Sequence, residues 1–246
     1  MTRTPIPTRR PRLVLALLLA ALVSLGAACG SGGSAAPDVS LAVAGVVSGE
    51  TTVARPDGDT PVYASPDAAE PDQVLPGVTE FGSPLALVVL DRGTSGWLHV
   101  QLPTRPNGST GWIEADGVEL RTVTTAITVD LDARRLVVTD GGTPVLETTA
   151  AVGAPGTPTP TGTFFVTDML STGEDGGSYG PFALGLSAHS EVLTEFAGGD
   201  GQVGIHGTNQ PDSIGAAVSN GCVRVPNDLA LQLRGLVSLG TPVTVG

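Results

Sequence analysis

The sequence predicts a mostly β protein. Glycine and proline are abundant, with 34 and 20 of the 246 residues, whereas charged residues make up 15% and aromatic residues only 4%. Short β-prone runs are separated by turn signals along most of the chain. This balance favours many short strands over long helices. The length allows a leader followed by two modest domains or by one larger domain.

The chain is acidic and contains no lysine. Its twelve basic residues are all Arg, against 24 Asp and Glu, and four of these Arg lie in the first 28 residues. Because binding to a phosphate backbone requires clustered cations, we expect no nucleic-acid partner. We interpret the acidity as a solvated surface, with recruitment of a cationic partner as the less favoured alternative.

Residues 1–28 are predicted to be a signal peptide. A basic region covers residues 1–12, and an apolar run follows from Leu13 to Val23. Small residues then precede Cys29. Eleven apolar residues fall short of the roughly 20 that a membrane-spanning helix needs, so secretion is favoured over a retained anchor. We therefore expect the mature protein to act outside the cytoplasm.

Cys29 and the residues before it resemble the lipobox of bacterial lipoproteins. In that pattern Leu stands three residues before the cysteine, whereas here Leu25 stands four before it. The resemblance implies lipidation of Cys29 and a membrane anchor that faces the cell wall; cleavage and release is the alternative. Residues 29–50 are small and flexible, as expected of a tether.

Residues 51–123 are predicted to form a small β-barrel. Alternation places Leu98, Val100 and Leu102 on one strand face, which is buried, and Trp97, His99 and Gln101 on the other, polar face. The turn pattern resembles bacterial SH3-like modules. Trp97 and Trp112 are interpreted as packing residues rather than a ligand platform. The β-prone runs lie at residues 60–65, 83–91, 96–102, 109–115 and 117–123.

Residues 124–246 contain a second series of strands. A hairpin is expected over 126–142, with its turn near Ala133–Arg135. One helix is predicted after Asn227 as its N-cap, with Gly240 as its stop. Its apolar face comprises Leu229, Leu233, Leu236 and Val237. Further strands are expected at residues 143–153, 162–168, 181–188, 202–208 and 241–245.

Cys222 and His206 are the candidate reactive groups. The chain has two cysteines, so an acylated Cys29 leaves Cys222 alone in an oxidising compartment, where an unused thiol is a liability. A buried structural role for this thiol is the alternative. His206 leaves its strand opposite the aliphatic Val203 and Ile205. An imidazole that takes the thiol proton, and then holds a thiolate–imidazolium pair, would activate the nucleophile.

Gly221 also fits acyl transfer. With no side chain in the way, the N–H groups of Gly221 and Cys222 could face a developing oxyanion. Zinc is excluded by counting, because one available Cys and three scattered His lack the close spacing of known sites. We therefore expect no metal and no cofactor.

The segment from His206 to Arg224 resembles the L,D-transpeptidases of the YkuD type. Their motif is a histidine followed some fifteen residues later by Ser/Thr-His-Gly-Cys and a polar residue two further on. Here it is His206, then Ser219-Asn220-Gly221-Cys222-Val223-Arg224. The similarity continues through residues 153–166 and 178–187, and it implies a β-sandwich catalytic domain over 124–246, with one or two short helices.

The resemblance implies a role for each motif residue. Cys222 would be the nucleophile and His206 the base, and the Gly207 carbonyl would orient the imidazole. Ser219 and Gly221 would shape the loop.

Three further residues are assigned to the substrate. Arg224 would grip a carboxylate, with an internal salt bridge as the equal alternative. Tyr179 would line the donor groove or contact the oxyanion, with packing as its alternative. Asn220 stands where most members carry His, so the acceptor step would rely on His206 alone.

The function implied by the resemblance is peptidoglycan cross-linking, which supports the cell wall and cell shape. Cys222 would attack a diamino acid carbonyl in a tetrapeptide stem, expel D-alanine and form a thioester, which the amine of a second stem resolves. Carbapenems would acylate the same thiol. The alternatives are an L,D-carboxypeptidase, in which water resolves the thioester, and a non-catalytic wall-binding lipoprotein. The sequence leaves the oligomeric state and the role of the first domain open.

Overall fold

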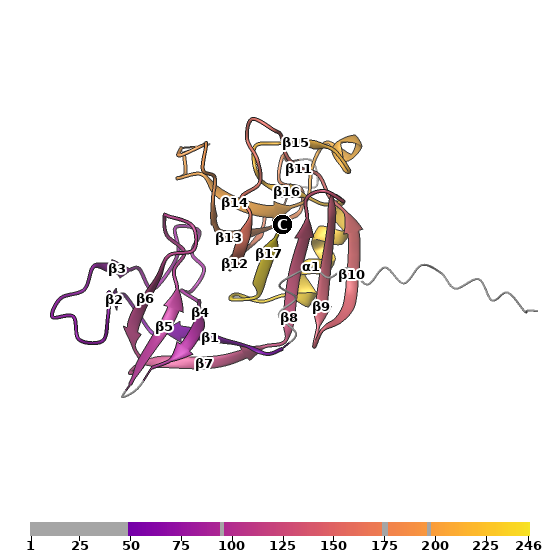
Figure 1. Cartoon of the computed structure of the whole chain (residues 1–246). Helices are drawn as coiled ribbons and strands as arrows, with labels where there is room; N and C mark the ends of the chain where they lie inside the picture. The colour runs from indigo at the N-terminus through magenta and orange to yellow at the C-terminus, as the bar shows by residue number, and fades with distance from the viewer. Residues whose placement is uncertain (1–48, 94–95, 174–176, 196–197) are drawn as a thin grey trace, which may run out of the picture. The chain divides into compact units, whose positions relative to one another are not determined.

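The computed structural model describes residues 49–93, 96–173, 177–195 and 198–246, and Figure 1 shows the order of their strands. The predicted signal peptide, Cys29 and nearly all of the tether lie outside these residues. The mostly β prediction is confirmed, since one α-helix accompanies the strands in the described ranges. In these ranges no helix combines the length and the apolar character that crossing a membrane requires.

The first half of the described chain forms a five-stranded antiparallel sheet in the order β6-β5-β4-β1-β7, beside a hairpin of β2 and β3. The strands have these bounds: β1 Thr51–Pro56, β2 Thr60–Val62, β3 Gln73–Leu75, β4 Leu87–Arg92, β5 Trp97–Gln101, β6 Thr110–Glu114 and β7 Val118–Val123. Each predicted run contains a strand, whereas β1 and β3 were not predicted. The SH3-like assignment stays a prediction.

Strand β5 shows both the value and the limit of the alternation pattern. Leu98, Val100 and Leu102 are buried as predicted. Gln101 was assigned to a polar face, but it is buried as well, and its Nε2 donates a hydrogen bond to the carbonyl of Thr163 at 2.6 Å. A strand in the second half of the chain, and not a neighbour of β5 in its own sheet, therefore supplies the partner that a buried amide requires.

The second half forms an eight-stranded sheet in the order β10-β9-β8-β17-β12-β13-β14-β16. Strand β17 pairs with β8 in parallel, and β14 pairs with β16 in parallel. A short parallel pair joins β11 (Val152–Gly153) to β15 (Ala217–Ser219). The strands of the large sheet have these bounds: β8 Thr125–Asp130, β9 Arg135–Asp140, β10 Thr143–Thr149, β12 Gly162–Ser171, β13 Phe182–His189, β14 Gln202–His206, β16 Val223–Arg224 and β17 Pro242–Val245.

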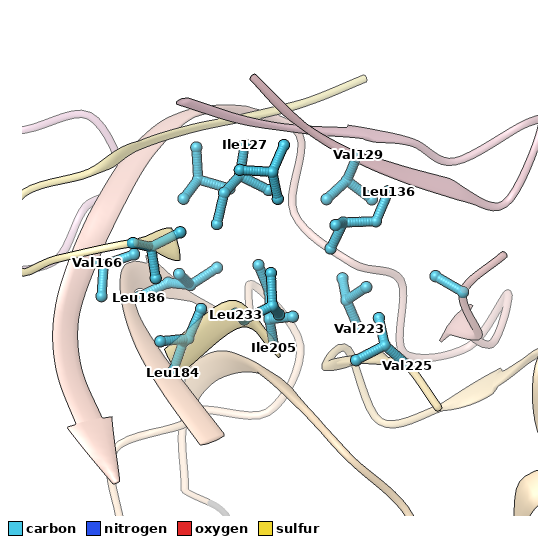
Figure 2. Packing of buried hydrophobic residues seen from close by; sticks show 14 of the residues in the cluster. Ile127, Val129, Leu136, Val166, Leu184, Leu186, Ile205, Val223, Val225 and Leu233 are labelled. Carbon is cyan, nitrogen blue, oxygen red and sulfur yellow. The ribbon is translucent and has the colours of Figure 1, made fainter. Parts of the chain in front are cut away.

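This sheet encloses its own core. Figure 2 shows Ile127 and Leu136, from β8 and β9, facing Leu184 and Ile205, from β13 and β14. The predicted sandwich is therefore realised by one sheet that curls, rather than by two separate sheets. Strand twist and a register shift between Val166 and Asp168 of β12 permit the curl.

Helix α1 (Asn227–Leu236) packs against β13 and β14. Its predicted apolar face is confirmed by buried Leu233 and Val237. The predicted N-cap is wrong: Pro226 occupies that position, and the Asn227 side chain bonds elsewhere. Gly240, predicted to stop the helix, lies beyond its end, in the turn before β17 with a φ of 84°.

Strand β12 contributes to two cores. Phe164 and Val166 point into the core of the large sheet, whereas Phe165 packs into the cluster of the five-stranded sheet with Leu87 and Ile113. Alternating side chains of one strand therefore serve opposite faces. Residues 43–246 form one compact unit.

Candidate active site

Cys222 and His206 are brought together by the parallel pairing of β14 and β16. Ile205 pairs with Val223 in this register, and both side chains lie in the hydrophobic core. Because side chains alternate along a strand, Cys222 and His206 project from the opposite face. A strand pair that is buried on one face thus presents both predicted reactive groups on the other.

Both residues line one cleft of about 530 Å³. Cys222 is half-buried, whereas His206 is only 4% exposed. The other lining residues come from the large sheet, its loops and one loop of the first half: Glu80, Phe81, Leu170, Thr172, Tyr179, Ala183, Leu184, Gly185, Gly198, Gly199, Gly201, Gln202, Val203 and Gly204.

The Cys222 thiol is held by the neighbouring strand. The backbone N–H of Gly204 donates a hydrogen bond to its Sγ at 3.4 Å. Burial raises the pKa of the thiol, while the Gly204 N–H and the positive charge of Arg224 oppose that rise. The thiol is therefore protonated at neutral pH. Gly204 was missed from the sequence, although it shares a strand face with His206.

His206 is oriented by the next peptide unit. Its Nδ1 lies 2.5 Å from the carbonyl oxygen of Gly207. This contact favours the tautomer that carries its hydrogen on Nδ1, which leaves Nε2 to accept a proton. Burial lowers the pKa of His206 to about 4; the Gly207 hydrogen bond opposes this shift and the Arg224 charge adds to it.

The resting pair is therefore a neutral thiol and a neutral imidazole. The thiolate–imidazolium pair expected from the sequence would then form only when the imidazole takes the thiol proton. The reason is burial, because a charge on either group loses hydration that the surrounding groups do not replace. The imidazole is then suited to remove the thiol proton during attack, as a general base.

The Gly207 peptide is held in a tight cluster. The N–H of Thr208 donates to Oδ1 of Asn227 at 2.7 Å, and a Cβ at Gly207 would lie 2.3 Å from that same oxygen. The backbone of Gly180 also lies next to the position that a Cβ at Gly207 would occupy. Asn227 thus fixes the peptide that orients His206. Sequence reasoning missed this role because a polar residue before an apolar run first suggests a cap.

Ser219 organises the loop before Cys222. Its hydroxyl donates to the Cys222 carbonyl at 2.5 Å and accepts the Gly221 N–H at 3.1 Å, and the side chain is 1% exposed. Thr157 adds a hydrogen bond to the Ser219 carbonyl. The expected pair of oxyanion donors is therefore incomplete, because the Gly221 N–H is already used. An oxyanion would have to rely on the Cys222 N–H.

Comparisons with known proteins identify relatives of the second half of the chain. The L,D-transpeptidase catalytic domain family, YkuD, matches residues 124–245. "Putative L,D-transpeptidase YkuD" of Bacillus licheniformis is 36% identical over 124 residues, covering 50% of this chain and 67% of that protein. The chain belongs to the L,D-transpeptidase family.

Other family members share shorter stretches. The Bacillus subtilis protein of the same description is 40% identical over 95 residues, which cover 39% of this chain and 49% of that protein, so about half of its length is spanned. The solved catalytic domain of the E. faecium L,D-transpeptidase is 29% identical, and the match covers 50% of this chain and 96% of that one, with a TM-score of 0.36.

In this L,D-transpeptidase domain the three residues assigned to substrate occupy different places. Tyr179 is 44% exposed, lines the cleft, and packs edge-on against His206 with ring centroids 4.8 Å apart. Burial, and then Cys222, raises the pKa of Tyr179. Asn220 is exposed and does not line the cleft.

Arg224 differs from one of its expected roles. Its Nη1 donates to Oε1 of Gln210 at 3.1 Å, so a neutral amide, and not the expected carboxylate of an internal salt bridge, holds the guanidinium. Its buried Nε has no hydrogen-bond partner in the described part of the chain. Within the same residues, no cluster of three His, Cys, Asp or Glu could hold a metal.

Proposed function

We propose that this protein is a peptidoglycan L,D-transpeptidase that works through a Cys222 thioester. The observation that carries the proposal is the placement of Cys222 and His206 on one face of adjoining strands, in one cleft, with the imidazole oriented by Gly207. Family membership supports the reaction class. The substrates are peptidoglycan stem peptides.

In the first step Nε2 of His206 accepts the thiol proton as Sγ of Cys222 attacks the carbonyl carbon of the diamino acid. A carbon–sulfur bond forms, and the Cys222 N–H stabilises the oxyanion. The carbon–nitrogen bond then breaks, and His206 gives its proton to the leaving D-alanine amine. The product is a thioester on Cys222.

In the second step the amine of another stem attacks the thioester carbon. His206 accepts a proton from the attacking nitrogen and returns it to the sulfur as the carbon–sulfur bond breaks. The product is a cross-link between two diaminopimelate residues. Tyr179 contributes to the groove beside the imidazole.

Hydrolysis of the same thioester is a second candidate. An L,D-carboxypeptidase would use water in place of the amine, and Asn220 at the motif position usually held by His favours this outcome. Accumulation of dimeric muropeptides separates the two activities. A wall-binding protein without catalysis would need neither the thiol nor its base.

The remaining assignments are part of the same proposal. A signal peptide over residues 1–28 and lipidation of Cys29 would place the enzyme outside the cytoplasm, anchored to the membrane and facing the wall. Residues 51–123 would be an SH3-like domain. Carbapenems would acylate Cys222.

The test is intact-protein mass spectrometry of residues 43–246, which form one compact unit, after incubation with a carbapenem. We expect one equivalent bound to the wild-type chain and none to Cys222→Ala. Incubation with a disaccharide tetrapeptide then follows, with dimers expected from the wild type only. Labelling of Cys222→Ala would refute the proposed nucleophile.

A further inference from the structure

The loop formed by residues 78–84, between β3 and β4, reaches the cleft of the large sheet. Glu80 and Phe81, which are the described residues of the first half that line this cleft, are both exposed. Phe81 is a large apolar side chain that is 50% exposed. The first half of the protein therefore supplies part of the wall of the cleft that holds the reactive pair.

The loop has a defined shape. The Thr79 N–H donates to the Ser83 carbonyl at 2.8 Å, and the Ser83 N–H donates to Oγ1 of Thr79 at 3.1 Å. Gly82 supplies the positive φ, 83°, that the turn needs. Glu80 and Phe81 at its tip are therefore presented by a closed turn.

The loop is also attached to the large sheet. Oγ1 of Thr79 donates to Oδ1 of Asp168 on β12 at 2.5 Å, and Asp168 is 1% exposed. Nearby, Asn107 exchanges two hydrogen bonds of 2.8 Å with the backbone of His189. The hydrogen bond from Thr79 to Asp168 ties the loop to β12, next to the residues at its tip, and so holds Glu80 and Phe81 in place at the cleft.

The tip of the loop carries a carboxylate, and the described residues that line the cleft with it include no Arg. Glu80 supplies this carboxylate, and the chain contains no Lys. An adjoining cavity of about 300 Å³ shares Glu80, Phe81 and Gln202 with the cleft. Its two other acids already have partners, because Asp200 lies 2.9 Å from Nε2 of His189 and Asp168 accepts the Thr79 hydroxyl, so Glu80 is the carboxylate left for a ligand. A carboxylate beside an aromatic ring suits an alkylammonium group, through ionic and cation–π attraction.

We propose that Glu80 and Phe81 bind the side-chain ammonium of a diamino acid in the stem peptide, so that the first half of the protein helps to select the substrate. This rests on the proposed function. The ammonium could belong to the donor stem, whose carbonyl is attacked, or to the acceptor stem before it loses its proton. The two sources share one chemistry, and the experiment separates them.

The primary test measures binding without turnover. In a Cys222→Ala background, calorimetry gives the Kd of a tetrapeptide stem with a free side-chain amine and of the same peptide acetylated on that amine. We expect Glu80→Gln to weaken binding of the free-amine peptide by about tenfold and to leave the acetylated peptide within twofold. Glu70→Gln, an exposed Glu of the same half, is the matched control.

The second test assigns the ammonium to donor or acceptor. With Cys222 intact, the rate of D-alanine release from a free-amine stem peptide reports binding of the donor stem. The rate at which a preformed acyl group on Cys222 is transferred to a diamino acid acceptor reports binding of the acceptor stem. Glu80→Gln is expected to slow one of the two reactions at low substrate concentration. Glu70→Gln, which lies outside the cleft lining, is expected to slow neither and to keep the carbapenem labelling of the wild type.

Equal affinity of Glu80→Gln and its parent for the free-amine peptide would overturn the inference, as would an equal loss for the acetylated peptide. Failure of the proposed function appears differently. If the wild type is not acylated by a carbapenem or a stem peptide, the reaction is wrong, but the binding comparison in the Cys222→Ala background still decides the role of Glu80.

Discussion

The hydroxyl of Ser219 is fixed to the backbone of Cys222, because it donates a hydrogen bond to the Cys222 carbonyl at 2.5 Å and also accepts the N–H of the intervening glycine at 3.1 Å. One buried side chain thus satisfies two backbone groups at the end of the loop that carries the thiol. The position of the sulfur in the cleft depends on this contact.

Ser219→Ala is expected to lower the free energy of unfolding by about 1–3 kcal/mol, because two backbone groups lose their partner. Carbapenem labelling is expected to slow by about tenfold or more as the loop loses its geometry. Ser219→Thr keeps the hydroxyl and is the control. Urea unfolding and timed mass spectrometry check both effects, and an unchanged labelling rate in Ser219→Ala would contradict the argument.

Gly221→Ala tests backbone strain. Gly221 has a φ of 115°, and a Cβ at this position would lie 3.6 Å from its nearest neighbouring atom. Glycine is therefore required here by the positive φ and not by a lack of space. We expect a loss of about 1–3 kcal/mol in stability, together with slower labelling. Gly235→Ala, in α1 with open space around it, should instead stabilise the fold by about 0.5–1 kcal/mol. Similar effects of both substitutions would be inconsistent with strain.

Local patterns predicted the elements better than their partners. The hairpin of β8 and β9, the helix face around Leu233 and strand β14 all follow from spacing within a few residues. The parallel pairing of β17 with β8 joins the two ends of the second half, and no local pattern reports such a pairing. The short strand β3 carries too few residues for a period to be recognised.

The candidate site divides in the same way. The motif indicated Cys222 and His206, and the alternation of β14 gave the correct face. The sequence could not show that the Gly221 N–H is already bonded, that Asn227 holds the peptide beside His206, or that Glu80 reaches the cleft. Each of these depends on a contact between segments that are brought together only by the tertiary fold.

His206 should make stability depend on pH. Its pKa is lowered from 6.5 to about 4 in the folded state, so the unfolded chain binds the extra proton first as pH falls. Stability from this group is complete above pH 6.5 and is lost progressively down to about pH 4. The loss is about 3 kcal/mol at most. Urea unfolding of wild type and His206→Gln across this range should diverge, and parallel curves would count against the buried neutral imidazole.

The same neutral pair predicts the pH profile of acylation. A general base with a pKa of about 4 is unprotonated through the neutral range, so the labelling rate should be nearly level from about pH 6 to 8 and fall toward pH 4. Because the pKa of Cys222 is raised, thiolate absorbance should develop only at a pH above the range in which a cysteine thiol ordinarily loses its proton. A strong thiolate signal at pH 7 would instead indicate an ion pair.

Asn220→His tests what decides the fate of the thioester. Asn220 is exposed and lies outside the cleft lining, so the substitution should preserve the fold and leave carbapenem labelling within twofold. An imidazole at this position can accept a proton from an incoming amine, which Asn cannot do, so the ratio of dimeric to hydrolysed muropeptides should rise. Asn209→His, at another exposed position beyond His206, controls for the added imidazole. If neither variant changes the ratio, the choice between amine and water does not depend on a second proton carrier, and His206 alone serves both nucleophiles.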